Sequence, residues 1–350
     1  MTFEPGCLAT GIGSLPHLEP SKAVDTIFAN MPEIPFWPQL PKKGIMEGMI
    51  GQFGESLPAL RYDKAKDRYY FDTSSDLSGE LEVFYQRYLD KSYSSFSISE
   101  NNAAGLHEVI TRLRKEMPLK ARYIKGQITG PITFGTAAKD ETGKDIIHND
   151  LIFDVVKKGL AMKGCWQVGL FKELGFPAII FLDEPGLVSI GSAYSSLGRD
   201  DIIHTWNETA DLLHQEGAIV GIHCCGNTDW SLLFESKTNI ISFDAYGFMD
   251  KIFLYAEGLQ AFLSRGGILA WGIVPTTDTE RKETAENLVT RIDSAFNRLA
   301  SLGIDKGLVF SRSLITPSCG MGLSEIDKSV HRLELASKVS SILRGKNSVI

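Results

Sequence analysis

Short apolar runs rich in Ile, Val and Phe alternate along the chain with longer segments in which apolar residues recur at helical spacing. The runs predict eight strands: Cys7–Ile12, Ile34–Trp37, Ala121–Ile128, Ala178–Leu182, Ala218–Ile222, Asn239–Phe243, Gly267–Ile273 and Gly307–Phe310. The clearest helices are expected at Asp201–Gln215, Ile252–Ser264, Ala285–Leu302 and Glu325–Leu343. Strands that are apolar on both faces and alternate with amphipathic helices are typical of a parallel sheet covered by helices.

Eight such units predict a (β/α)8 TIM barrel that forms one catalytic domain over residues 1–350. A dinucleotide-binding fold is not favoured, because no Gly-x-Gly-x-x-Gly follows a predicted strand. Residues 51–92 break the pattern, and we expect an insertion there, with a hairpin around the charged stretch Arg61–Arg68. A second apolar run, Ser94–Ile98, competes with Ile34–Trp37 for a place in the barrel.

In a barrel, the carboxyl ends of the strands meet on one face, where catalytic groups lie. His223 and Cys225 are two apart on a predicted extended backbone, so they project the same way while Cys224 faces the opposite side. An imidazole and a thiolate aimed together are half of a tetrahedral zinc site, and Cys319 could supply a third ligand. Three protein ligands with an open fourth position are typical of a catalytic zinc.

The alternative is that these cysteines are core residues, since free cysteine is among the most buried residue types. His-x-Cys also occurs often by chance. A metal site therefore depends on whether the fold brings Cys319 to His223 and Cys225.

Composition narrows the class of protein. A net charge of -7 over 350 residues argues against a nucleic-acid or anionic-membrane partner. No apolar run approaches the roughly 20 residues needed to cross a bilayer, and the N-terminus lacks the pattern of a signal peptide. The 5 cysteines include no Cys-x-x-Cys pair, so a disulfide framework is not expected. We expect a cytoplasmic protein whose thiols stay reduced and available to a metal.

Five short motifs follow one another between about residue 8 and residue 325. They are Gly11–Pro16 (GIGSLP), Ile128–Pro131 (ITGP), Asp183–Pro185 (DEP), His223–Cys225 (HCC) and Pro317–Gly320 (PSCG). In this order they resemble the Ile-Gly-Ser-Phe-Pro, Leu-Thr-Gly-Pro, Asp-Glu-Pro, His-x-Cys and Pro-Asp-Cys-Gly segments of the cobalamin-independent methionine synthases. The same motifs are similar to those of the wider methyltransferase branch of the uroporphyrinogen decarboxylase-like barrels.

The resemblance implies a zinc ion bound by His223, Cys225 and Cys319. The remaining ligand in the family is an acidic residue on the next strand, and Asp244 occupies the matching position. The family residue is usually Glu, so the shorter Asp leaves its reach to the metal open.

The resemblance also implies where substrate binds. Asp183 matches the carboxylate that holds the amino group of homocysteine, and Ser14 matches the residue that meets the substrate carboxylate. We add Glu184, from the same Asp-Glu-Pro segment, and Gln39, near the end of the second predicted strand, as candidate substrate-binding residues.

The sequence departs from the family in three places. Full-length methionine synthases of this kind carry a second, N-terminal barrel, for which this chain has no room. The family's strand-seven His, associated with protonating the folate leaving group, is replaced by the segment Ile273–Thr276 (IVPT). The acidic residue expected near strand two is not evident, and Trp37–Gln39 (WPQ) occupies that region.

The first two departures together argue against methyltetrahydrofolate as methyl donor. The single-barrel methyltransferases of this group take methyl groups from methylated corrinoids, so the resemblance favours a corrinoid presented by a carrier protein. The third departure leaves the thiol acceptor open. The predicted function is a zinc-dependent transfer of that methyl group to a thiol, with homocysteine, which would give methionine, preferred over coenzyme M or another thiol. Two alternatives stay open. One is a uroporphyrinogen-decarboxylase type of enzyme, although its N-terminal Arg-rich motif is missing; the other is a non-catalytic protein that handles zinc or corrinoid.

Overall fold

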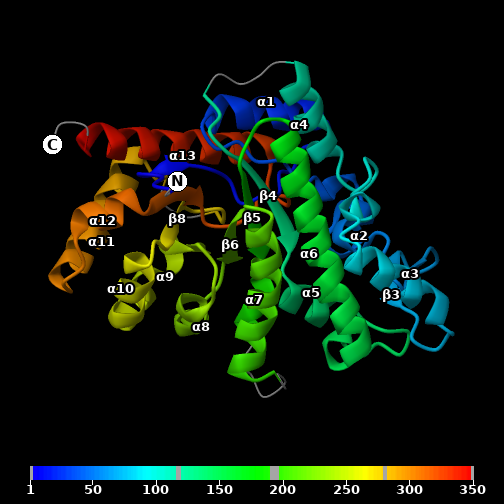
Figure 1. Cartoon of the computed structure of the whole chain (residues 1–350). Coiled ribbons are helices and arrows are strands. Elements are labelled where there is room, and N and C mark those ends of the chain that lie inside the picture. Colours follow the sequence, from blue (N-terminus) through cyan, green and yellow to red (C-terminus); the bar gives the residue numbers. More distant parts are fainter. Residues whose placement is uncertain (1–2, 116–119, 190–196, 279–281, 348–350) are drawn as a thin grey trace.

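The computed structural model describes residues 3–115, 120–189, 197–278 and 282–347. A parallel sheet of 7 strands in the order β1-β9-β8-β7-β6-β5-β4 curls through the centre, and helices surround it (Figure 1). Its strands are β1 (Leu8–Ala9), β4 (Ile124–Thr129), β5 (Ala178–Asp183), β6 (Ile219–Cys224), β7 (Ile240–Phe243), β8 (Ile268–Val274) and β9 (Ser313–Pro317). Nearly every strand residue is buried, as expected for a parallel sheet covered on both faces.

The segment 34–39 lies between the two edges of this sheet. Isolated parallel bridges join Phe36 to Lys125 on β4 and Gln39 to Ser14 beyond β1. The predicted strand Ile34–Trp37 is therefore a bridging segment and not a regular strand. Proline has no N–H to donate to a ladder, and Pro35 and Pro38 interrupt the pairing. The described sheet is TIM-barrel-like, with seven regular strands where the sequence predicted eight.

The last strand was predicted at the wrong residues. Residues Gly307–Phe310 belong to the short helix α12 (Lys306–Ser311), and the strand β9 comes directly after it. The Asp305 carboxylate begins the helix by accepting a hydrogen bond from the Leu308 amide at 2.7 Å. A short apolar run is compatible with either helix or strand, so its periodicity could not decide between them.

The helices predicted in the second half are present, with one split in two. They are α7 (Arg199–Gln215), α9 (Ala245–Ile252), α10 (Ala256–Ser264), α11 (Ala285–Ser301) and α13 (Ile326–Asn347). The single helix expected over Ile252–Ser264 corresponds to α10 and the end of α9, which are separated by a 3-10 turn at Phe253–Tyr255. The other helices are α1 (Pro20–Asn30), α2 (Met49–Gly54), α3 (Ser78–Leu89), α4 (Ala104–Lys115), α5 (Pro131–Ala137), α6 (Asp150–Glu173) and α8 (Trp230–Glu235).

The insertion contains the expected hairpin. Strand β2 (Leu60–Asp63) pairs antiparallel with β3 (Arg68–Phe71), and α3 follows them. The competing run at Ser94–Ile98 is not a strand, because Tyr93–Phe96 form a 3-10 turn. Figure 1 shows the hairpin and α3 at one side of the molecule, outside the ring of helices that covers the sheet.

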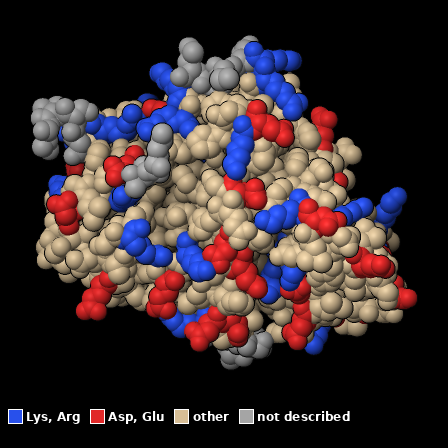
Figure 2. Space-filling model, viewed as in Figure 1, with Lys and Arg blue, Asp and Glu red and all other residues tan. Residues whose placement is uncertain are grey.

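The surface agrees with the mixed charge of the sequence. Figure 2 shows acidic and basic side chains interspersed over the displayed face, and neither sign forms a continuous field there. Within the described residues, none of the helices combines the length and the apolar character that a bilayer crossing requires.

Candidate metal centre

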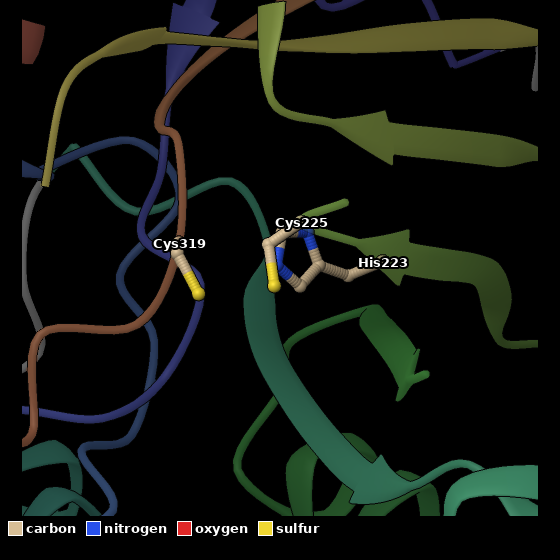
Figure 3. Close-up of side chains that lie close together, drawn as sticks. All are labelled: His223, Cys225 and Cys319. Atoms are coloured by element: carbon tan, nitrogen blue, oxygen red, sulfur yellow. The ribbon is translucent and has the colours of Figure 1, made fainter. Parts of the chain in front are cut away.

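The fold brings together the three side chains that the sequence singled out. His223 lies near the end of β6, Cys225 follows that strand, and Cys319 lies just beyond β9. One ligand atom from each residue lies within 4.8 Å of the other two. In Figure 3 the side chains come from two separate segments and point toward one another. Segments about a hundred residues apart in the sequence thus converge at the carboxyl end of the sheet.

Cys224 lies on the other face of β6, as the alternation of strand side chains requires. Its side chain is fully buried, and its thiol contacts the Gly226 carbonyl at 3.5 Å. Burial raises the pKa of Cys224 to about 12, which keeps the thiol protonated and inert. Of the two adjacent cysteines, only Cys225 faces His223 and Cys319.

The imidazole of His223 has one engaged and one unengaged nitrogen. Its Nδ1 lies 3.0 Å from the Ser242 hydroxyl, whereas its buried Nε2 has no hydrogen-bond partner among the described residues. An unpartnered nitrogen in a buried site is costly unless it binds something. Its position beside two thiols fits a metal ligand.

The two thiols affect each other's ionisation. The neighbouring Cys319 thiol and the His223 imidazole lower the pKa of Cys225, and the Cys225 thiol raises the pKa of Cys319. The ligand atoms of a tetrahedral zinc site lie roughly 3.5 Å apart, given Zn–S and Zn–N bonds of about 2.3 and 2.0 Å. The observed cluster therefore fits Zn²⁺ with small side-chain adjustments.

These residues line one wall of a cavity of about 840 Å³. Such a volume lies within the range of small-molecule sites and is larger than a small thiol needs. The cavity opens at the carboxyl ends of the strands. Its lining includes four more residues that the sequence analysis proposed as substrate-binding or metal-binding: Ser14, Gln39, Asp183 and Asp244.

Asp183 is the last residue of β5 and pairs in register with His223. It is 6% exposed, and its Oδ1 has no hydrogen-bond partner among the described residues. Burial raises the pKa of Asp183 to about 6, and the nearby Lys125 ammonium opposes this rise. Lys125 is itself fully buried and donates to the Ile12 carbonyl and to the Gln127 amide oxygen. A carboxylate with a free oxygen in this setting is suited to bind a cation.

Ser14 ties the first strand's loop to the segment that carries Cys319. Its hydroxyl accepts a hydrogen bond from the Gly322 amide at 3.1 Å. A Cβ at Gly320 would lie 2.3 Å from the same hydroxyl oxygen, so only glycine permits this approach. Gln39, which forms a parallel bridge with Ser14, donates to the Gln52 side chain at 2.8 Å.

The fourth expected ligand is not part of the cluster. Asp244 lines the cavity, but its carboxylate caps helix α9 by accepting from the Gly247 amide at 2.8 Å. The described group of close metal-capable atoms contains His223, Cys225 and Cys319 without it. The short Asp side chain is retained at the helix terminus where a Glu would extend further.

Glu184 lies outside the cavity, contrary to its expected role in substrate binding. It is fully buried and accepts hydrogen bonds from the Ile132 amide at 3.1 Å, the Thr133 amide at 2.7 Å and the Trp206 indole at 2.9 Å. Two of these donors belong to the first turn of α5. Glu184 thus holds this helix and α7 onto the sheet.

A carboxylate that the sequence reading missed lies in the cavity wall. Glu47 is 2% exposed and accepts hydrogen bonds from the Ala104 amide, the Leu40 amide and Gln52. Burial raises its pKa to about 7, against the effect of the two backbone amides. The glycines at positions 44 and 48, which flank a short turn, were the available signal that the chain returns to the cavity.

Comparisons with known proteins support the fold of this chain and do not indicate a reaction. No protein-family model and no curated protein matches the sequence. A structure of the GH20 catalytic modules of the pneumococcal exo-β-D-N-acetylglucosaminidase is similar with a TM-score of 0.50 and 12% identity, over 96% of this chain and 83% of that chain. A second structure of that enzyme gives 0.50 and 11%, over the same shares of the two chains. A D-psicose 3-epimerase structure with D-fructose gives 0.37 and 10%, over 69% of this chain and 84% of that one.

At these identities the likeness to the glucosaminidase concerns the fold alone, and it agrees with a TIM-barrel-like arrangement. The class of the molecule is therefore an α/β protein with a curled parallel sheet and a cavity at the carboxyl ends of its strands.

Replacing either cavity-facing cysteine should abolish metal binding. We expect about one zinc ion per chain in the purified protein, and a loss of most of it in Cys225→Ser and in Cys319→Ser, since each change removes a thiolate ligand. Cys224→Ser is the matched control and should keep its zinc, because that side chain faces the core. Elemental analysis of the three variants decides this, and equal loss in all three would contradict the assignment.

Glu184→Gln should destabilise the fold without changing zinc content. The amide can accept through one oxygen only, so at least one of the buried donors from Ile132, Thr133 and Trp206 loses its partner. The free energy of unfolding should fall by about 1–3 kcal/mol. Urea denaturation monitored by circular dichroism measures it. Unchanged stability together with weaker thiol binding would instead indicate a role in the cavity.

Proposed function

We propose that this protein is a zinc-dependent methyltransferase that moves a methyl group from a methylated corrinoid to a thiol, with homocysteine as the preferred acceptor. The observation that carries the proposal is the convergence of two thiols and the unpartnered Nε2 of His223 on the wall of one cavity. The motif resemblance to the single-barrel methyltransferases supports it. We further propose that segment 34–39 takes the place of the second strand in a complete barrel.

The residues present would hold zinc through His223, Cys225 and Cys319 and leave one position for substrate. Coordination to zinc at that position would lower the pKa of a substrate thiol, which is ordinarily near 8.5, so that the thiol binds as the thiolate and its proton is released to solvent. Two thiolate ligands add negative charge around that position, which favours a nucleophilic sulfur. The cavity walls would then orient the thiol toward the methyl group, and near-attack geometry can contribute much of the rate.

The surroundings of Asp183 favour an amino-thiol as the acceptor. Its free carboxylate oxygen lies in the cavity next to the strand that carries His223. An ammonium group would neutralise this buried charge, whereas the sulfonate of coenzyme M would be repelled by it. The Ser14 hydroxyl also lines the cavity, and because it accepts from the Gly322 amide its own O–H can donate to a substrate carboxylate.

The end of β8 favours a corrinoid donor. Val274 closes the strand, and Pro275 and Thr276 follow it along the cavity. Thr276 is engaged with Ser318 through its amide at 3.2 Å and its hydroxyl at 3.1 Å. None of these three residues has a side chain that titrates near neutral pH to protonate a leaving nitrogen. A reduced corrinoid departs without a proton, so the absence of a histidine here is compatible with that donor.

The donor would be a corrinoid carrier protein that presents its methyl group at the wide cavity mouth, in the cytoplasm. A non-catalytic corrinoid-binding protein would use the same ligands, so turnover separates the two functions. A decarboxylase of the uroporphyrinogen type has no use for the clustered thiols.

Asp183→Asn should impair the use of homocysteine while zinc stays bound. A desolvated carboxylate–ammonium pair contributes on the order of 2–5 kcal/mol, so kcat/KM for homocysteine should fall on the order of 30-fold or more. The control substrate is 2-mercaptoethanol, which has no amino group and should be used equally well by both proteins. Equal loss with both thiols would show that Asp183 has a structural role, and no loss with either would remove it from the substrate site.

Methylcobalamin should serve as a methyl donor and methyltetrahydrofolate should fail. The N5 of the folate is a poor leaving group unless it is protonated, and the segment after β8 offers no histidine for this. The assay follows demethylation of the corrinoid spectroscopically against a panel of thiols, with zinc measured on the same preparation. Comparable turnover with methyltetrahydrofolate would overturn the donor assignment. Corrinoid binding without demethylation by any thiol would favour the accessory protein.

A further inference from the structure

One polar side chain in the sheet interior has no role in the function described so far. Strand β7 reads Ile240, Ile241, Ser242, Phe243, and Ser242 is its only polar residue. Its side chain is fully buried, where a hydroxyl is costly unless it is hydrogen-bonded. Its hydrogen-bond partner is the Nδ1 atom of His223, 3.0 Å away.

The strand register fixes this contact. β6 and β7 are parallel neighbours, and His223 is paired with Ser242 in the ladder. Adjacent strands lie about 4.8 Å apart, so the pairing of the two strands alone places the hydroxyl within hydrogen-bond distance of the imidazole. His223 is 2% exposed, and water has little access to compete for Nδ1.

The contact determines which ring nitrogen is free. In a neutral imidazole one nitrogen carries the proton and the other has the lone pair, and the hydrogen bond of the first decides the tautomer. If Nδ1–H donates to the Ser242 hydroxyl, the lone pair is on Nε2. Nε2 is the atom that has no protein partner and lies beside Cys225 and Cys319.

We propose that Ser242 is a positioning residue for His223: its hydroxyl accepts the Nδ1–H hydrogen bond, and it thereby holds the ring with a deprotonated Nε2 directed at the metal position. This inference rests on the proposed zinc site. It adds a residue that touches neither substrate nor metal and that no motif in the sequence points to. Outer partners of metal-bound histidines typically change metal affinity by 10–100-fold.

The test measures the affinity of the purified protein for Zn²⁺ alone, by competition with a chromophoric chelator. Ser242→Ala removes the acceptor and little volume, and it should weaken zinc binding by about 10–100-fold. Ser242→Thr keeps the hydroxyl and should restore most of the affinity.

Ser313→Ala is the matched control. Ser313 is equally buried on β9, and its hydroxyl accepts from the Trp271 indole at 2.9 Å and donates to the Val309 carbonyl at 2.6 Å. This change should cost similar stability while leaving zinc affinity near that of the parent. Thermal unfolding of all variants verifies that they are folded.

A second readout is independent of affinity. Long-range proton–nitrogen NMR of histidine-labelled protein without zinc, with the His223 signal assigned by its loss in His223→Gln, should show the Nδ1–H tautomer in the parent. Ser242→Ala should show a mixture.

The outcomes separate the two proposals. A parent that binds zinc, with Ser242→Ala binding equally tightly, would overturn the role of Ser242 and leave the zinc site intact. An Nε2–H tautomer in the parent would do the same. A parent that binds no zinc would overturn the proposed function, and the inference with it.

Discussion

The parallel register of β5, β6 and β7 is the constraint on which the candidate site depends. It sets Asp183, His223 and Ser242 side by side across three adjacent strands. The ladder hydrogen bonds fix these positions within the buried sheet, so a cavity-lining carboxylate, a metal-capable nitrogen and the hydroxyl beside it are placed by the strands and not by loops. Sites on strands are held more accurately than sites on loops. A slip by one residue would turn each of the three toward the opposite face.

The third ligand depends on a different kind of constraint. Cys319 lies beyond β9, where no ladder holds it, and the loop is fixed through the hydroxyl of Ser14. The Gly322 amide donates to that hydroxyl, and Gly320 approaches it so closely that a Cβ could not be accommodated. A segment near the beginning of the chain and one near its end are thereby joined at the cavity. The Gly-Ser motif at Ser14 and the Cys-Gly motif at Cys319 lie far apart in the sequence, but they contact each other in the fold.

The sequence predicted most of the architecture because strands buried on both faces appear in it as short continuous apolar runs, and helices as apolar residues at helical spacing. The strands from β4 to β8, the hairpin in the insertion and the facing of Cys224 away from Cys225 all follow from such local patterns. The errors have physical causes. Pro35 and Pro38 turned a predicted strand into a bridging segment, and the Asp305 cap turned Gly307–Phe310 into a helix. The sequence pattern located the candidate side chains, but it could not show which hydrogen bonds they make. The carboxylates of Asp244 and Glu184 are therefore engaged in a way that the sequence did not predict.

The hydrogen bonds of the nearby carboxylates support the proposed three-ligand site. Asp244 is committed to the start of α9 and Glu184 to the start of α5, whereas Asp183 keeps one buried oxygen free. Three protein ligands leave a position for an exogenous sulfur, as catalytic zinc sites require. If Asp244 also bound the metal, an incoming thiol would have to displace it or expand the coordination. Its use as a helix cap occupies that carboxylate. Under the proposed function, the unpartnered oxygen of Asp183 is then the acceptor that the ammonium group of an amino-thiol would meet beside the metal position.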